Sequence, residues 1–559
     1  MSKKKKLYSV LICLSSIIII AFISMTFVVI KDNYKLVEYR GRQYNPISIE
    51  NLREGYHDTF KEIYNSFTTN NNPTRYSDLK TYYINVDVNE YNSLSTNLPE
   101  SGQEYIDAYM RYEDKMHKVK LRFRGDNTWH WLYDKKSYRI KTKKDDLIDG
   151  IRKFNFVNAR EKTMLVDYLE AQIATQMGIL AANVEPVRVF MNNKYAGVFL
   201  YIDQTDESFL RNNKKLPSNL YVGEAKEDVW GNIEVWEKHA EYNVMEESDF
   251  SDLNELLTVS NNGNKDIFPY EIEQILDIEK YLKWNAFMEI SKSRHVTKVH
   301  NNKFYFDPSN GKFEPIAWDA FGLSNNGGSQ YNTTNIPLNL LNYRMLQNPE
   351  YVELSNQYIW ESIQMEEIID FTLLKLDEMY STIRADVYAD RYKDYVDFTD
   401  SDWKSRTYTN IEFEKNVEVL KEWLRLREAF LVSEIKRNNI YLVQSDIDIG
   451  NREGVLKFIA DGISGTKIED ISFNNTYNEG SIQIWRDINI NGILDKEDQF
   501  INEQEIVNNE IRITLNEVIL PGRKEIKEEK YRVNMSCVLE PSPLEYQFIV
   551  KYIGEEEGQ

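Results

Sequence analysis

The chain has 559 residues, enough for two or three folded units, and 42% of them are hydrophobic, which excludes a disordered chain. The 89 acidic residues exceed the 68 basic ones, and the resulting formal net charge of -21 argues against nucleic acid as the main partner. The two cysteines, Cys13 and Cys537, exclude a disulfide framework and a cysteine-based zinc site.

The N-terminus predicts a membrane anchor. Four lysines precede residues 7–30, which contain no charged side chain and are long enough to cross a bilayer as a helix. An uncleaved signal anchor over residues 1–31 is expected, with the lysines in the cytoplasm and the rest of the chain outside the cell. A cleaved signal peptide, which would make the protein secreted, is the alternative. Residues 32–74 are expected to form a stalk, polar and extended over 32–46, and an entry segment with a short helix at 59–66.

Two basic strands are expected between residues 118 and 143. Alternation gives the first strand an apolar and a basic face, and residues 135–141 form the second after a turn at 125–127. Basic side chains that converge on paired strands can grip phosphates, although a solvated sheet face gives the same pattern. The basic candidates are Arg124, Lys136, Arg139 and Lys141.

A helix and a strand pair follow. Apolar residues recur at helical spacing over 162–177, and this helix contains Asp167 and Glu170, either of which could pair with a basic residue of the strands. Two strands are then expected up to residue 203. Gly197 in the second of them predicts close packing of another element.

A hairpin over residues 303–318 is the centre of the predicted site. Asp319 follows its return strand directly, and Gly322 comes shortly after. An acidic residue at the end of a buried strand suits a magnesium–phosphate site, because the carboxylate can hold a hard cation and the glycine lets the backbone approach the ligand. A plain hairpin whose Asp319 caps the next turn is the alternative.

Helical segments surround this hairpin. They are expected at 249–259 and 270–290 before it, and long amphipathic helices at 367–391 and 410–438 after it. The order of elements predicts an α+β arrangement, with a sheet-rich first half and a helical second half.

Residues 441–559 predict a β-sandwich-like module with a calcium loop. Alternating segments such as 454–459 and 481–486 are typical of its strands. Within it, residues 487–498 have the spacing of a calcium-binding loop, with glycine at the sixth position. A plain Asx-rich turn is the alternative. The calcium ligands would be Asp487, Asn489, Asn491, the Ile493 carbonyl, Asp495 and Asp498.

Several of these segments together resemble the CotH (spore coat protein H) kinase family. They span roughly residues 75–440 in the family's order, which is more specific than any one motif. The resemblance implies an atypical protein-kinase-like fold, with a sheet-rich N-lobe and a helical C-lobe, that transfers phosphate from ATP to proteins. The segments are the Arg124-Gly125-Asp126 turn with strand 135–141, residues 192–200, the hairpin from Asn302 to Asp319, and the helix with Arg425, Arg427 and Leu431.

The resemblance also implies roles for single residues. Asp319 stands where the metal-binding aspartate of a kinase Asp-Phe-Gly motif lies, so it would hold Mg²⁺ or Mn²⁺ beside ATP. The nucleotide-binding candidates are then Arg124, Lys136, Arg139, Lys141 and Glu170.

The chain departs from the family at the catalytic base. The family commonly has an aspartate about five residues before the hairpin asparagine, here Asn302, and residues 294–302 contain no acidic residue. His295 or His300 could replace it as the base, since histidine titrates near neutrality, or both could only hydrogen-bond the hairpin. The catalytic candidates are therefore His295, His300 and Asn302.

Two functions from different classes remain. The first is a surface-anchored CotH-type kinase that phosphorylates proteins. The second is a non-catalytic cell-surface or spore-coat protein that binds or adheres, with its kinase-like domain and calcium module as scaffolds. The expected partners are a protein substrate or coat protein, a nucleotide, and the membrane through the N-terminal helix.

Overall fold

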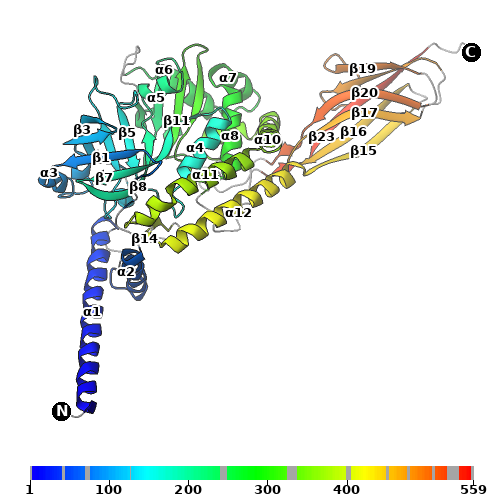
Figure 1. The fold of residues 1–559 in the computed structure, drawn as a ribbon. Helices are drawn as coiled ribbons and strands as arrows, with labels where there is room; N and C mark the ends of the chain where they lie inside the picture. The colour runs from blue at the N-terminus through cyan, green and yellow to red at the C-terminus, as the bar shows by residue number, and fades with distance from the viewer. Residues whose placement is uncertain are drawn as a thin grey trace, which may run out of the picture.

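The computed structural model describes residues 3–40, 45–68, 73, 76–125, 127–239, 248–323, 336–397, 404–448, 452–474, 479–506, 510–524 and 540–554. Helices and strands are mixed along the chain, which confirms the α+β class. An N-terminal helix, a central domain and a C-terminal group of strands lie in succession (Figure 1). Asp126 of the predicted turn and Cys537 lie outside the described residues.

Two helices form the N-terminal part. α1 (Lys3–Arg40) projects from the central domain, and α2 (Ile49–Thr68) packs against it (Figure 1). Residues 12–37 of α1 are long and apolar enough to cross a membrane, as the sequence predicts for this region.

The stalk differs from its prediction. Residues 32–40 are helical rather than extended, because neither glycine nor proline interrupts α1 there. The second helix is also longer than the segment predicted at 59–66. Its first half packs on α1, where Gly55 lies against Val29, and this contact supports a helix that local pattern alone does not predict.

Seven strands of the first half close into a barrel. Their order around it is β1-β2-β3-β4-β5-β8-β7. Burial alternates along β3 as predicted, with Leu121 and Phe123 inside. β4 begins three residues later than predicted, because Lys135 is drawn into a buried ion pair. The strands are β1 (Thr81–Val86), β2 (Ile106–Tyr112), β3 (Lys115–Phe123), β4 (Tyr138–Lys141), β5 (Lys153–Val157), β7 (Val184–Met191) and β8 (Lys194–Asp203).

A second sheet contains the predicted hairpin. Its strands, in the order β10-β9-β11-β12-β6, are β10 (Trp236–Lys238), β9 (Leu220–Gly223), β11 (Asn302–Asp307), β12 (Lys312–Ala317) and β6 (Leu180–Ala181). β11 and β12 pair in antiparallel register with Phe304 opposite Pro315, which confirms the hairpin.

Helices cover this sheet and form the rest of the domain. The helix predicted over 270–290 is two helices, because Leu276 is extended and the Asp277 side chain caps a new helix by accepting from Lys280 N. The helices predicted at 162–177, 249–259, 367–391 and 410–438 lie close to their predicted places, whereas those at 88–93, 340–345 and 349–364 were not predicted. The elements are α3 (Val88–Ser93), α4 (Val166–Gln176), α5 (Glu207–Asn212), α6 (Ser251–Asn261), α7 (Phe268–Ile275), α8 (Ile278–Ser291), α9 (Leu340–Met345), α10 (Pro349–Gln364), α11 (Ile368–Ala389), α12 (Asn410–Ile435), and the short strands β13 (Asp394–Val396) and β14 (Ser405–Thr407).

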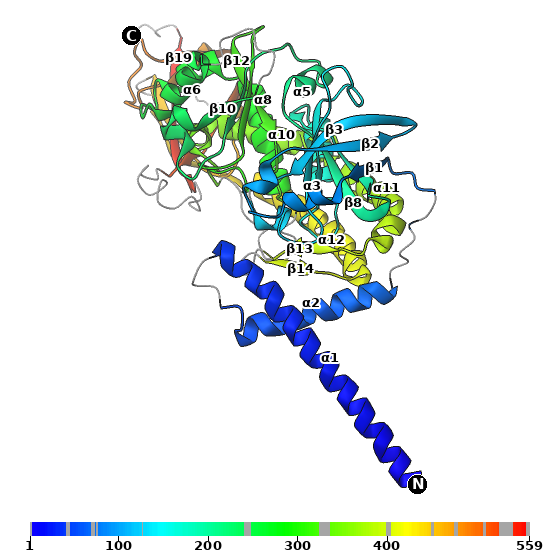
Figure 2. The ribbon, with the colours of Figure 1, turned by 90° about the vertical axis from the view of Figure 1, so that its left-hand side faces the viewer.

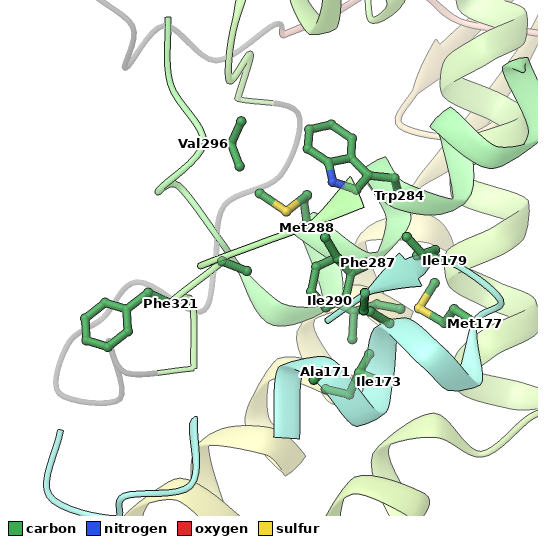
Figure 3. Close-up of a cluster of buried hydrophobic side chains, with 14 of the residues drawn as sticks. Ala171, Ile173, Met177, Ile179, Trp284, Phe287, Met288, Ile290, Val296 and Phe321 are labelled. Carbon is green, nitrogen blue, oxygen red and sulfur yellow. The ribbon is translucent and has the colours of Figure 1, made fainter. Parts of the chain in front are cut away.

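The main core lies between α4 and α8. Ala171 and Ile173 of α4 pack with Phe287 and Ile290 of α8, and all are buried (Figure 3). This packing holds α4 next to the end of the hairpin, so that Asp167 and Glu170 of α4 reach the candidate site.

The barrel is fastened to α11 by a buried ion pair. Lys135 Nζ lies 2.7 Å from Asp390 Oδ2, and both side chains are almost fully buried. Gly197 faces this pair with φ at +119°, and a Cβ there would lie 2.2 Å from the Asp390 carboxylate. The close packing predicted at Gly197 is therefore confirmed, and α11 provides the partner.

Strands make up the C-terminal module. A sheet in the order β15-β16-β23-β18-β19 and the pair β17-β20 share one apolar core, which includes Phe458, Ile484, Ile513 and Phe548. The strands are β15 (Asn438–Asp448), β16 (Glu453–Gly462), β17 (Thr466–Asn474), β18 (Ser481–Asp487), β19 (Gln499–Glu505), β20 (Glu510–Ile519), β21 (Gly522–Arg523), β22 (Pro541–Ser542) and β23 (Leu544–Ile553).

Two residues, 436–437, join the module to α12. The loop after β16 rests on α10: Asn356 Nδ2 donates to Ile463 O at 3.2 Å, and Gly465 N donates to Glu353 Oε2 at 2.6 Å. The module is thus fixed to the central domain by hydrogen bonds as well as by the chain.

Candidate functional site

A small cavity lies beside Asp319, where the barrel meets α4 and the hairpin. Its volume is about 50 Å³. Apolar residues of β5, β7, β8 and α8 form part of its wall, and charged side chains form the rest. The charged residues are Arg124, Arg160, Asp167, Glu170 and Asp319.

Asp319 contacts two side chains, those of Arg160 and His295. Its Oδ1 lies 2.5 Å from Arg160 Nη2, and its backbone carbonyl accepts from His295 Nδ1 at 2.8 Å. Burial acts to raise the pKa of Asp319, but the positive charges of Arg160, His295 and Arg124 outweigh it and hold the pKa well below its usual value. The carboxylate is therefore ionised at neutral pH.

The backbone at Asp319 is left-handed, with φ at +47°, and so is that of Phe321 at +48°. Two such residues in a short turn need support from their surroundings. The Arg160 guanidinium provides part of it by lying 4.3 Å from the centre of the Phe321 ring.

Glu170 provides the main support. Its carboxylate accepts the backbone N–H groups of Phe321 at 2.8 Å, Gly322 at 2.6 Å and Leu323 at 3.0 Å. Burial, with the nearby charge of Asp167, raises the pKa of Glu170 to about 8, against the effect of the three N–H donors. Glu170 thus holds the loop after Asp319 rather than pairing with a basic residue of the strands.

Gly322 is required by a close approach within the chain. A Cβ at this position would lie 2.3 Å from Ser291 O and 2.6 Å from Ser293 N. The glycine therefore lets the loop after Asp319 pass the end of α8, whereas the sequence interpretation assigned it to the approach of a ligand.

The predicted basic residues separate into two groups. Arg124 lines the cavity. Lys136 Nζ instead donates to the carbonyls of Trp131 at 2.7 Å and Tyr133 at 2.9 Å, and Arg139 Nε donates to Asn155 Oδ1 at 3.0 Å. Lys141 lies on β4 opposite Lys153 of β5. The structure therefore brings Arg124 to Asp319 and places the other three along the barrel wall.

His300 and Asn302 lie at the start of the hairpin. Asn302 Oδ1 accepts from Trp230 Nε1 and Asn339 Nδ2, and its Nδ2 donates to the carbonyls of Thr297 and His300. His300 is exposed. Of the three catalytic candidates, His295 is the one that touches Asp319, and the Asn302 amide fixes the turn before β11.

Two charged residues of the cavity wall were not predicted as site residues, and neither was a lysine that contacts Trp318 of the same wall. Arg160 and Asp167 line the cavity, and burial raises the pKa of Asp167, with Arg160 opposing this. Lys303 on β11 lies 3.3 Å from the Trp318 ring centre and donates to Thr205 Oγ1 at 3.0 Å. Burial lowers its pKa to about 7. A lysine within an apolar strand is a signal that could have identified Lys303.

The predicted calcium ligands lie on the turn between β18 and β19. Asn489 and Asn491 donate from Nδ2 to Asp495 Oδ2 at 2.9 and 3.1 Å, and Asp487 Oδ2 accepts from Gly492 N at 2.7 Å. Gly492 has φ at +74°, as the sharp turn requires. Asp498 accepts the N–H groups of Ile488 and Asp495, and Ile493 N donates to Asn491 Oδ1.

These oxygens are occupied by hydrogen bonds of the loop itself. Within the part of the chain that the structure describes, no group of three or more His, Cys, Asp or Glu side chains could hold a metal ion. To ligate a cation, the amides of Asn489 and Asn491 would have to turn their oxygens toward Asp495.

Comparisons with known proteins agree with the resemblance. The family model described as CotH kinase protein matches residues 121–431, more than half of the chain. The inner spore coat protein H of Bacillus subtilis (strain 168) is 25% identical over 344 residues, which cover 58% of this chain and 90% of that protein. The matched residues include the last three residues of β3, the hairpin, Asp319 and most of α12.

A solved complex of the Shewanella oneidensis MR-1 toxin–antitoxin proteins HipA and HipB with operator DNA also matches, with a TM-score of 0.21 and 12% identity. The match covers 50% of this chain and 59% of that one. Such a weak likeness says nothing about the fold. The family model, by contrast, matches more than half of the chain and includes every residue that lines the cavity, so the chain belongs to the CotH family.

Proposed function

We propose that the central domain is a CotH-type protein kinase, with the barrel as its N-lobe and the helices as its C-lobe. The observation that supports this most is the ionised Asp319 at a cavity that also contains Arg124, Arg160 and Asp167. A carboxylate beside guanidinium groups can hold a hard cation and phosphate oxygens together. Family membership supports the same reaction.

The charged residues suit phosphoryl transfer. Bound Mg²⁺ or Mn²⁺ would neutralise charge on the phosphates. Asp319 would hold the cation, and Arg124 and Arg160 would hold phosphate oxygens. The substrate hydroxyl oxygen forms a bond to the γ-phosphorus of ATP, the bond to ADP breaks, and the hydroxyl proton passes to a carboxylate.

Asp167 is the proposed proton acceptor. It provides at the cavity the acidic side chain that residues 294–302 lack, and burial raises its pKa, which strengthens it as a proton acceptor. His295 donates to the backbone of Asp319, so it positions the metal-binding aspartate.

Nucleotide binding requires the site to open. Pockets for small molecules are about 300–1000 Å³, much larger than this cavity of about 50 Å³. The Arg160–Asp319 ion pair lies in the cavity wall and occupies the carboxylate that the cation would need. Separation of this pair frees both side chains at once.

The test is thermal unfolding of the full chain in detergent with ATP and Mg²⁺ or Mn²⁺. We expect the wild type to be stabilised by about 2.7 kcal/mol at a ligand concentration of 100 times Kd, and Asp319→Asn to show no shift. Asp114→Ala, in the exposed turn between β2 and β3, is the control and keeps the shift. No shift of the wild type at millimolar ATP would overturn the kinase and favour the non-catalytic binding protein. Transfer of labelled phosphate to protein then distinguishes an active kinase from one that only binds nucleotide.

We propose that the domain lies outside the cytoplasm, at the cell surface or in a spore coat, with α1 as an uncleaved anchor. The length and apolar character of α1 support the anchor, and the similarity to a spore coat protein supports the setting. The four lysines before the apolar run favour a cytoplasmic N-terminus.

We also propose that the C-terminal module is a β-sandwich whose 487–498 loop binds calcium. Two sheets with a shared core support the sandwich, and the spacing of the oxygens supports the ion. In the full chain, calcium is expected to raise the temperature at which the module unfolds in the wild type and in Asp114→Ala, and to leave that temperature unchanged in Asp487→Ala. An unfolding temperature of the wild type that is equal in millimolar calcium and in chelator would contradict this proposal.

A further inference from the structure

The helix α2 attaches to the central domain by its charged face. Arg406 of β14 lies 2.8 Å from Glu54 and 2.9 Å from Asp58. Lys61 lies 2.7 Å from Glu412 at the start of α12, and Asn65 Nδ2 donates to Tyr408 O at 2.8 Å. These groups recur at helical spacing, so they define one side of α2.

Four apolar side chains of α2 face solvent. Ile49 is 88% exposed, Phe60 60%, Ile63 43% and Phe67 85%. Their spacing of 11, 3 and 4 residues places them in one stripe of the helix. A surface helix of a globular domain normally turns this stripe toward the core and its charges outward, and α2 does the reverse.

α2 also packs on the candidate membrane span. The Tyr56 ring stacks on Phe22 with centroids 5.4 Å apart, and a Cβ on Gly55 would meet Val29 at 2.3 Å. Asn33 Nδ2 donates to Pro46 O at 2.9 Å just before α2 begins. α2 therefore crosses α1 at contacts that run from Phe22 to Asn33, around the point where the uncharged run 7–30 ends and the charged residues Lys31 and Asp32 begin.

The direction of α2 matches a membrane surface. It crosses α1 rather than running along it, and in both views β14 lies on one side of α2 and the N-terminus of α1 on the other (Figures 1 and 2). Since the charged face meets β14, the apolar stripe points away from the domain, toward the side on which the span continues.

We propose that α2 lies in the plane of the outer membrane–water interface, with Ile49, Phe60, Ile63 and Phe67 in the phospholipid bilayer. This rests on the proposal that α1 spans the membrane. Amphipathic helices bury such stripes about 5–10 Å into the boundary of headgroups and acyl chains. The bilayer covers a stripe that the domain leaves exposed, and α2 with its ion pairs then sets the domain directly on the membrane.

The test places a fluorescent label on the full chain in phospholipid vesicles. Cys13→Ala and Cys537→Ser give a background without cysteine, to which Phe60→Cys, Phe67→Cys, Phe27→Cys or Met365→Cys is added and labelled with an environment-sensitive dye. Phe27 on α1 and Met365 after α10 are 71% and 75% exposed and serve as the inserted and the aqueous control. Spin-labelled lipids are expected to reduce the emission at 60, 67 and 27 by about twofold or more and to leave 365 unchanged.

The outcomes distinguish a failure of the interfacial position of α2 from a failure of α1 as the membrane anchor. Quenching at 27 without quenching at 60 and 67 would overturn the interfacial helix and leave the anchor intact. A blue-shifted emission at 60 and 67 without lipid quenching would show that a second copy of the chain covers the stripe, which also overturns it. Absence of quenching at 27 would mean that α1 does not span the bilayer, and the anchor would fail together with the inference built on it.

Discussion

Replacing Glu170 with alanine is expected to unfold the loop after Asp319 and to abolish nucleotide binding. The change removes the acceptor of three buried N–H groups, those of Phe321, Gly322 and Leu323. An unsatisfied buried donor costs about 1–3 kcal/mol, so the loss of all three acceptor contacts should lower the free energy of unfolding by at least about 3 kcal/mol. Chemical denaturation measures this loss, and hydrogen exchange at residues 321–323 locates it.

Glu170→Gln keeps the size of the side chain and removes its ionisable group, so it separates the contributions of shape and charge to the free energy of unfolding. Its amide oxygen can still accept the N–H groups of Gly322 and Leu323, while its NH₂ group faces the N–H of Phe321. The expected loss of unfolding free energy therefore lies between those of the wild type and the alanine variant. The control is Glu422→Ala on the exposed side of α12, for which a change within about 0.5 kcal/mol is expected. An alanine variant as stable as this control would contradict the role given to Glu170.

The same carboxyl predicts a dependence on pH. Its pKa is about 8 in the folded chain against an ordinary value of 4.5, so the folded state binds more protons between these values. The stability that Glu170 contributes is therefore fully present below pH 4.5 and is lost as the pH rises to 8, by at most about 1.4 kcal/mol per pH unit. Glu170→Gln should lack this part of the profile.

Asp390→Ala is expected to cost about 3–5 kcal/mol, because it leaves Lys135 buried without its carboxylate. The same carboxylate accepts Val198 N at 3.1 Å and Tyr392 N at 2.9 Å, so a barrel strand and the end of α11 lose contacts together. Urea denaturation of the full chain measures the loss.

A double-mutant cycle tests whether the charge is the cause. Lys135→Met with Asp390→Ala removes both ions and should be more stable than Asp390→Ala alone, with a coupling energy of about 1.5 kcal/mol or more. The exposed pair Lys375–Glu378 on α11 is the matched control, with a coupling below about 1 kcal/mol. Additive losses at Lys135 and Asp390 would show that the pair contributes through packing instead.

Local pattern predicted the hairpin and the position of Asp319. Alternating strands and a turn rich in glycine and asparagine are properties of neighbouring residues, and the structure has the hairpin within one residue of the prediction at each end. The support of the loop could not be predicted in this way. Glu170 and the N–H groups that it accepts are more than 150 residues apart in the sequence.

The basic strands show a second limit. Alternation identifies a basic face, but the closure of the barrel decides which side chain reaches the cavity. Arg124 lies at the end of β3 and reaches it, whereas Lys136 and Arg139 are bound by neighbouring carbonyl and amide oxygens. Arg160 lies in a loop before α4 with no periodic pattern, and tertiary contact alone brings it to Asp319.

The join between α12 and β15 has a mechanical consequence. A helix of 26 residues is about 39 Å long, and two residues separate it from a strand whose sheet is also fastened to α10. A load on the far end of the module is therefore transmitted through α12, whose first turn pairs with α2 through Glu412 and Lys61. Because the connection is so short, the module and α12 should move as one rigid unit. The far end of the module is then held at a fixed distance from α2.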